Sequence, residues 1–221
     1  TGAYDRNREF ILTTSPSMDI LISSNLERLI YRITGNDSAE TAQLMAALSG
    51  VGKYEITEKM KSELGDFYGN YATEAEAGEE IKRLYADYGY VIDTHTAVAS
   101  AVYRKYQEET GDCAKTIIAS TASPYKFVGS VMKSIGGEEA ENGTQSFYGA
   151  GEVDGRKAVD GRNAVQGVKT SQDDFELVDE LEKRSGIPVP DAVKEIRTAP
   201  VLHEKQCEAE GMKDVVREFL L

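Results

Sequence analysis

Apolar residues recur with helical spacing along most of the chain, and capping and stop residues divide the pattern into separate helices. Thr73 is followed three residues later by Glu76, a capping-box signature for a helix that runs to Tyr88 and ends at Gly89. Asp37 or Ser38 is expected to begin another helix. The expected helices cover residues 25–34, 39–48, 55–64, 73–88, 94–110, 125–135, 173–186, a segment starting at 190, and 211–221.

Two short segments read as strands, "GYVID" at 89–93 and "KTIIAS" at 115–120, because they are apolar, rich in β-branched residues and followed by turn formers. The helix between them, 94–110, is expected to be capped by Thr94 or Thr96. A strand, a helix and a strand at this spacing predict a right-handed βαβ unit in a parallel sheet. With the next helix packed back on the sheet, the fold class is α/β.

One interval differs in kind from the rest of the chain. Residues 136–172 are rich in Gly, Asn, Asp and Gln, and contain the near-repeat "VDGRKAVDGRNAV". The spacing of acidic residues that an EF-hand requires is absent, so we expect a surface insertion of turns. The predicted organisation is an α/β region over 1–135, this insertion over 136–172, and a helical segment over 173–221 that completes the same domain.

The charge balance narrows the possible partners. The 221 residues include 25 Lys and Arg against 38 Asp and Glu, a net charge of −13. Such a surface repels nucleic-acid phosphates and anionic lipids, so we expect neither nucleic acid nor membrane as a partner. Cys113 and Cys207, the two cysteines, lack metal-ligand spacing; we expect inert thiols in a reducing cytoplasm and no metal site.

The second expected strand ends in hydroxyl side chains, Ser120 and Thr121. In parallel α/β proteins, ligands bind outside the carboxyl ends of strands, which gives both hydroxyls a ligand-binding interpretation. They could equally well cap the following turn, and the strand pattern alone does not separate the two interpretations.

The string "STASPYKF" at 120–127 resembles a Thr-Ala-x-Pro-x-Lys-Phe motif of threonine synthases. Other segments resemble the same family in the same order: "TGAYDRNREFILTTSPSMDILISSNLERL", "YGYVIDTHTAVASAVY", "APVLH" and a final "MKDVVREFL". These motifs span nearly the whole chain outside the Gly-rich interval. The resemblance implies the C-terminal part of a tryptophan-synthase-β-like (type II) pyridoxal-phosphate fold, with a three-layer parallel-sheet architecture.

The family resemblance implies a cofactor and a reaction. Threonine synthases use pyridoxal 5'-phosphate to convert O-phospho-L-homoserine and water to L-threonine and phosphate. Thr121 stands at the family position whose hydroxyl faces the pyridine nitrogen of the cofactor, with Ser120 beside it. A hydroxyl there, unlike a carboxylate, does not hold that nitrogen protonated, which suits β,γ-replacement chemistry.

The first matching segment implies a wall of the substrate pocket. A dianionic phosphate would be served by an Arg fork and by hydroxyl donors near a helix N-terminus. The candidate substrate-binding residues are Arg28, Asn25, Ser17, Asp19 and Ser24. The alternative, which spacing alone favours, is that Asn25 caps the helix and Arg28 pairs with a surface carboxylate.

His95 follows the first expected strand, where related proteins carry Asp-Pro-His-Thr-Ala; Thr94 replaces the Pro here. We expect a hydrogen-bonded structural role for this histidine. The family's Schiff-base lysine segment and its Gly-Asn-Phe-Gly type phosphate loop do not occur in the sequence. We therefore expect no catalytic lysine in this chain. We also expect it to be inactive alone and to have the remaining N-terminal part of the enzyme as its partner.

The sequence is also compatible with two alternative functions. One is a paralogue of threonine synthase that releases phosphate by elimination without making threonine. The other is a non-catalytic acidic α/β interaction module that uses the Gly-rich interval as its interface.

Overall fold

The computed structural model describes residues 1–136, 174–200, 202 and 205–220. They divide into two compact units, Thr1–Ile187 and Pro188–Leu221. The Gly-rich interval expected as a surface insertion lies outside the described residues. The domain boundaries expected from the sequence stay predictions.

The N-terminal elements of the first unit enclose a small core of their own. The strands β1 (Ala3–Asp5) and β2 (Lys53–Glu55) pair antiparallel, with Tyr4 opposite Tyr54 and the two rings stacked at 5.6 Å. The helices around them are α1 (Leu26–Ile33), α2 (Ser38–Gly50) and α3 (Glu58–Ser62), and a 3-10 turn covers Pro16–Met18. The buried apolar residues of this core are Ile30, Ile33, Leu48, Tyr54, Ile56 and Met60.

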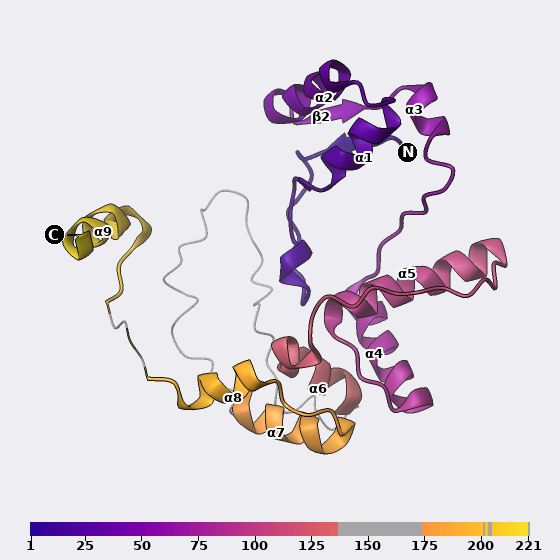
Figure 1. The fold of residues 1–221 in the computed structure, drawn as a ribbon. Helices are drawn as coiled ribbons and strands as arrows, with labels where there is room; N and C mark the ends of the chain where they lie inside the picture. Colours follow the sequence, from indigo (N-terminus) through magenta and orange to yellow (C-terminus); the bar gives the residue numbers. More distant parts are fainter. Residues whose placement is uncertain (137–173, 201, 203–204, 221) are drawn as a thin grey trace. The chain divides into compact units, whose positions relative to one another are not determined.

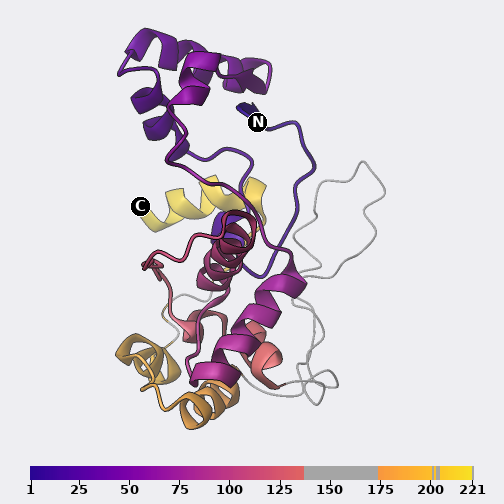
Figure 2. The same cartoon turned by 90° about the vertical axis from the view of Figure 1, so that its right-hand side faces the viewer.

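Four further helices lie in the described rest of the first unit: α4 (Glu74–Tyr88), α5 (Thr94–Thr110), α6 (Val128–Gly136) and α7 (Asp174–Ser185). α4 packs against α5 and α6, and α6 packs against α7, as Figures 1 and 2 show from two directions. Their fully buried side chains include Ile81, Val131 and Leu181. This packing holds the start of α5 and the segment before α6, which carry the polar residues described below.

A buried carboxylate also joins α4 to α5. Glu80, fully buried, accepts hydrogen bonds from Arg83 Nη2 at 2.7 Å and Ser100 Oγ at 2.7 Å, and Arg104 Nε lies 3.4 Å away. Burial acts to raise the pKa of Glu80, but the hydrogen bonds from Arg83 and Ser100 and the two positive charges outweigh it, so the pKa is lowered. The ion pairs therefore keep this carboxylate charged inside the helix pair.

The expected helices are largely confirmed, and their ends follow local capping. Asp37 caps α2 by accepting from Ala39 N and Glu40 N at 2.8 and 3.0 Å. The capping box of Thr73 and Glu76 begins α4, and Gly89 ends it with a φ of 65°. The segment expected as a helix over 55–64 is shorter, because Lys53–Glu55 forms β2 and only Glu58–Ser62 is helical.

The sheet differs from the expectation. Residues 89–93 and 115–120 are irregular instead of strands, and the sheet that the described residues form is the antiparallel pair β1–β2. A single strand is not stable without a neighbour to satisfy its backbone groups, and no described segment pairs with 115–120. Ile117, in the middle of this segment, is 92% exposed.

The second unit contains α8 (Asp191–Thr198), a 3-10 turn at Ala209–Gly211 and α9 (Met212–Leu220), which is the yellow helix of Figure 1. Pro190 is the N-cap of α8, so the helix starts at Asp191, one position after the start expected from the sequence. No helix in the described part of the chain combines the length and the apolar character that crossing a bilayer requires.

The capping box gives a first testable expectation. In Thr73→Ala, Glu76 N loses the hydroxyl acceptor at 3.3 Å, so we expect the free energy of unfolding to fall by about 1 kcal/mol in urea titrations. Thr73→Ser retains a hydroxyl and is expected to stay within a few tenths of a kcal/mol of the parent chain. Equal losses in the two variants would contradict a capping role for this hydroxyl.

Candidate functional site

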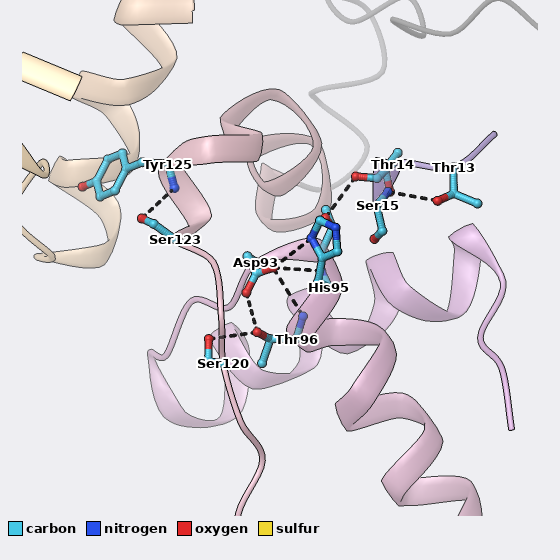
Figure 3. A network of polar contacts seen from close by, with 10 residues as sticks. Thr13, Thr14, Ser15, Asp93, His95, Thr96, Ser120, Ser123 and Tyr125 are labelled. Carbon is cyan, nitrogen blue, oxygen red and sulfur yellow. Dashed lines mark hydrogen bonds and ion pairs between the residues drawn. The ribbon is translucent and has the colours of Figure 1, made fainter. Parts of the chain in front are cut away.

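The candidate site is organised by one buried carboxylate at the start of α5. Asp93 is fully buried and stands at the N-cap, where Oδ1 accepts from His95 N at 2.9 Å and Thr96 N at 3.3 Å. Its Oδ2 accepts from Thr96 Oγ1 (Figure 3). The sequence led us to expect Thr94 or Thr96 as the cap; Asp93 takes this place because a short carboxylate can accept from both free amides of the first turn.

The network extends from Thr96 to the segment before α6. Thr96 Oγ1 lies 2.9 Å from Ser120 Oγ, 24 residues along the chain (Figure 3). Three residues further on, Ser123 Oγ accepts from Tyr125 N at 3.3 Å and begins a 3-10 turn, Pro124–Phe127. The Tyr125 hydroxyl donates to Ile187 O, and burial raises the pKa of this tyrosine. The segment 120–125 is therefore anchored at both ends.

A loop near the N-terminus joins the same site from another direction. Thr94 Oγ1 donates to Thr14 O at 3.0 Å, and Glu74 Oε2 at the start of α4 accepts from Thr14 N at 3.1 Å. Within the loop, Asp19 accepts from Thr13 N and from Thr13 Oγ1, both at 2.7 Å. These bonds hold the loop at the N-termini of α4 and α5.

His95 lies inside this network. Its Nδ1 is 3.3 Å from Asp93 Oδ1 and 3.4 Å from Thr94 Oγ1, and its ring contacts that of Phe127 with centroids 4.8 Å apart. Among the described residues its Nε2 is buried and has no hydrogen-bond partner. The Asp93 contact fixes the ring and, by favouring a proton on Nδ1, leaves Nε2 as an acceptor. The ring is thus held in the hydrogen-bonded setting that the sequence led us to expect.

The structure brings some of the sequence-predicted residues together and leaves others apart. Ser120 is part of the network, and Ser17 and Asp19 lie in the loop that Thr94 holds. Thr121 is exposed, and its hydroxyl has no hydrogen-bond partner in the described part of the chain. Ser120 is therefore fixed by its hydrogen bond with Thr96, whereas the Thr121 hydroxyl is not engaged by any described residue.

The other three candidates lie around the start of α1. Arg28 Nη1 donates to Asn25 Oδ1 at 3.1 Å, both side chains are exposed, and Ser24 is exposed beside them. The Asn25 side chain does not cap α1, because the residue itself has helical backbone angles. The expected pairing of Arg28 with a surface carboxylate is replaced by this amide contact. No hydrogen bond among the described residues ties these three side chains to the Asp93 network.

The sequence interpretation assigned no role to Thr13 or Asp93, and it suggested Thr94 and Thr96 only as alternative helix caps and not as parts of a network. The signal that could have found Asp93 is local, because Asp directly before an apolar-periodic helix is a strong N-cap residue. The contacts of Thr94 with Thr14 and of Thr96 with Ser120 join residues 80 and 24 positions apart, and no local pattern encodes them.

Comparison with known proteins points to one family. The family model described as "Threonine synthase, C-terminal" matches residues 96–171, which include Thr96, Ser120 and Thr121. The chain is 36% identical over 137 residues to human "Threonine synthase-like 1", which covers 61% of this chain and 18% of that protein.

Two solved structures are also similar. The chain matches pyridoxal-phosphate-bound threonine synthase from Brucella melitensis at 36% identity and a TM-score of 0.57, over 62% of this chain and 29% of that one. Yeast threonine synthase matches at 23% identity and a TM-score of 0.67 over 99% of this chain and 38% of that one, a likeness of fold. The resemblance to the C-terminal part of threonine synthases is therefore confirmed, and the chain spans less than two fifths of the length of these relatives.

The buried carboxylate leads to a second expectation. In Asp93→Asn, the amide nitrogen that replaces one oxygen cannot accept from an N–H or O–H donor, so we expect a loss of about 1–3 kcal/mol in the free energy of unfolding. Asp37→Asn is the matched control, because Asp37 caps α2 at an exposed position and Asn caps equally well. A loss at Asp93 no larger than that at Asp37, measured in urea, would show that the network adds nothing to capping.

Proposed function

We propose that this chain, which is related to the C-terminal part of threonine synthases, serves as that part of a full-length pyridoxal-phosphate enzyme that converts O-phospho-L-homoserine and water to L-threonine and phosphate. The observation that carries the proposal is the Asp93 network. It joins the loop at 13–19, the start of α5 and the segment from Ser120, which are the segments whose motifs resemble the family. The exposed Thr121 hydroxyl lies next to this junction.

Pyridoxal phosphate, when bound, supplies an electron sink for reactions at the carbons of an amino-acid substrate. The residues of this chain fit such a ring on one edge: Thr121 is exposed with an unengaged hydroxyl, and Ser120 beside it is fixed by Thr96. The Thr121 hydroxyl would donate a hydrogen bond to the ring nitrogen and keep its own proton, so that the nitrogen stays formally neutral. The rest of the cofactor would be held by other parts of the enzyme, since the lysine and phosphate-loop motifs of the family do not occur in this sequence.

The substrate phosphate would be bound by residues of the first segment. Arg28 uses one guanidinium nitrogen on Asn25 Oδ1, and the guanidinium retains further N–H donors for an anion. Ser17 and Ser24 are exposed hydroxyls that can also donate. Asp19 would act indirectly, since its carboxylate is engaged by Thr13 and shapes the loop that carries Ser17.

The irregular segment 115–120 would become a strand in the full-length enzyme. Its β-branched sequence and the 92% exposure of Ile117 are as expected of a strand whose neighbours are supplied from elsewhere. We propose that it enters a parallel sheet of a three-layer type II fold.

Both cysteines are unpaired and exposed, which supports a reducing, cytoplasmic location.

A second candidate function is an enzyme that eliminates phosphate from the same substrate without adding water. It is kept because the human relative is named "Threonine synthase-like 1" and not threonine synthase. Phosphate release and threonine formation assayed together on the full-length enzyme separate the two. Equal yields of both products support the synthase, and phosphate without threonine supports elimination alone.

Thr121 provides the direct test of the proposed cofactor contact. In the full-length enzyme, Thr121→Ala removes the donor to the ring nitrogen, and we expect turnover to fall about 10-fold or more, as loss of a positioned donor does, while cofactor is still taken up. Thr121→Ser is the control that keeps a hydroxyl and most of the turnover. Unchanged turnover in Thr121→Ala would remove this residue from the site.

The chain produced by itself gives a further expectation. Because it lacks the family's lysine motif, mixing it with pyridoxal phosphate is expected to give no new visible absorption band and no adduct that survives borohydride reduction. The full-length enzyme measured in parallel should give both. A reduced, stable adduct at one lysine of this chain, located by peptide mass, would contradict the proposed division of the site.

A further inference from the structure

We propose that Asp93, Thr96 and Ser120 form a one-directional hydrogen-bond relay that positions the hydroxyl of Thr121, so that Ser120 is a positioning residue and does not itself donate to the ligand. The inference rests on the proposed function for the identity of that ligand. It concerns how the chain presents Thr121, which the similarity to known proteins does not address.

The direction of the relay follows from counting protons. The carboxylate of Asp93 can only accept, so the Thr96 hydroxyl donates its single proton to Asp93 Oδ2. Thr96 Oγ1 then has no proton left for Ser120 Oγ, 2.9 Å away. The Ser120 hydroxyl must therefore be the donor of that bond. The hydroxyls of Ser120 and Thr96 therefore both donate their hydrogen bonds in the direction of the buried carboxylate.

This direction decides what each hydroxyl can still do. With its proton committed to Thr96, Ser120 Oγ can only accept from a further group. An unprotonated ring nitrogen is an acceptor and requires a donor, which Ser120 cannot supply. The Thr121 hydroxyl keeps its proton, because it has no partner in the described part of the chain. The two adjacent hydroxyls, expected together as cofactor-binding residues, therefore have different roles.

The relay is buried at its Asp93 end and exposed to solvent at its Ser120 end. Asp93 is fully buried and Thr96 is 7% exposed, whereas Ser120 and Thr121 are exposed. Within the described part of the chain, the bond to Thr96 is the one hydrogen bond that joins residues 115–121 to an element outside their own turn. Asp93 is in turn fixed by the first-turn amides of α5. The position of Thr121 is thus set by the start of α5.

The relay can be tested in the full-length enzyme with pyridoxal phosphate labelled with nitrogen-15 in the ring. Thr96→Val removes the hydroxyl without changing the size of the side chain, and Ser120→Ala removes the exposed end. We expect both to weaken cofactor binding about fivefold, the equivalent of one hydrogen bond of about 1 kcal/mol. Both should also move the ring-nitrogen NMR signal toward that of the free, unbonded base.

Matched variants separate loss of the positioning hydrogen bond from a non-specific loss of structure. Thr96→Ser retains the donor and should restore affinity and signal to within about twofold of the parent. Thr116→Val removes a hydroxyl whose one hydrogen bond to a described residue goes to the nearby Ala114 O, and it should change neither. The double variant Thr96→Val/Ser120→Ala should be no worse than either single variant, because the two groups act as one unit.

The outcomes distinguish this inference from the proposed function. If Thr121→Ala moves the ring-nitrogen signal but Thr96→Val and Ser120→Ala do not, the relay is wrong and the cofactor contact stands. If Thr121→Ala also leaves the signal unchanged, the cofactor contact itself is wrong, and the relay with it. A signal that moves in all three variants, with rescue by Thr96→Ser, is the result that the relay predicts.

Discussion

The carboxylate of Asp93 is the constraint on which the candidate site depends. An ionised carboxylate is costly to bury unless hydrogen bonds replace the water that it loses. Asp93 meets this requirement with two backbone amides, the Thr96 hydroxyl and the ring nitrogen of His95. Because every one of these donors belongs to the first turn of α5, the carboxylate fixes that turn, and the neighbouring segments are attached to it.

Attachment at one turn explains how segments far apart in sequence form one site. Thr94 holds the loop through Thr14, and Thr96 holds Ser120. Both are hydroxyl residues within the capped turn of one helix, so their separation is set by helix geometry. The buried Glu80, shared between α4 and α5, fixes the same helix against its neighbour further along. The result is a rigid support beside an exposed hydroxyl at Thr121.

The helices and their ends could be predicted from the sequence because their signals are local. The capping box of Thr73 and Glu76, the stop at Gly89 and the cap at Asp37 all lie within a few residues of the element that they define. The motif at 120–127 pointed to Ser120 and Thr121 by resemblance, and the structure places them beside the start of α5. The strand predicted over 115–120 does not form, because a strand needs a neighbouring strand to pair with and the described residues do not supply one. The β1–β2 pair was not predicted, because each strand has three residues and is too short to show an alternating pattern. The two strands also lie about 50 positions apart in the sequence.

The central claim is that the Asp93 network presents the Thr121 hydroxyl to the ring nitrogen of a bound cofactor. A crystal structure of the full-length enzyme with pyridoxal phosphate tests it most directly. The account predicts Thr121 Oγ1 within hydrogen-bond distance of the ring nitrogen, about 2.6–3.2 Å, with Ser120 Oγ still bonded to Thr96. A ring nitrogen that contacts a carboxylate, or a Thr121 hydroxyl turned away from the cofactor, would contradict it.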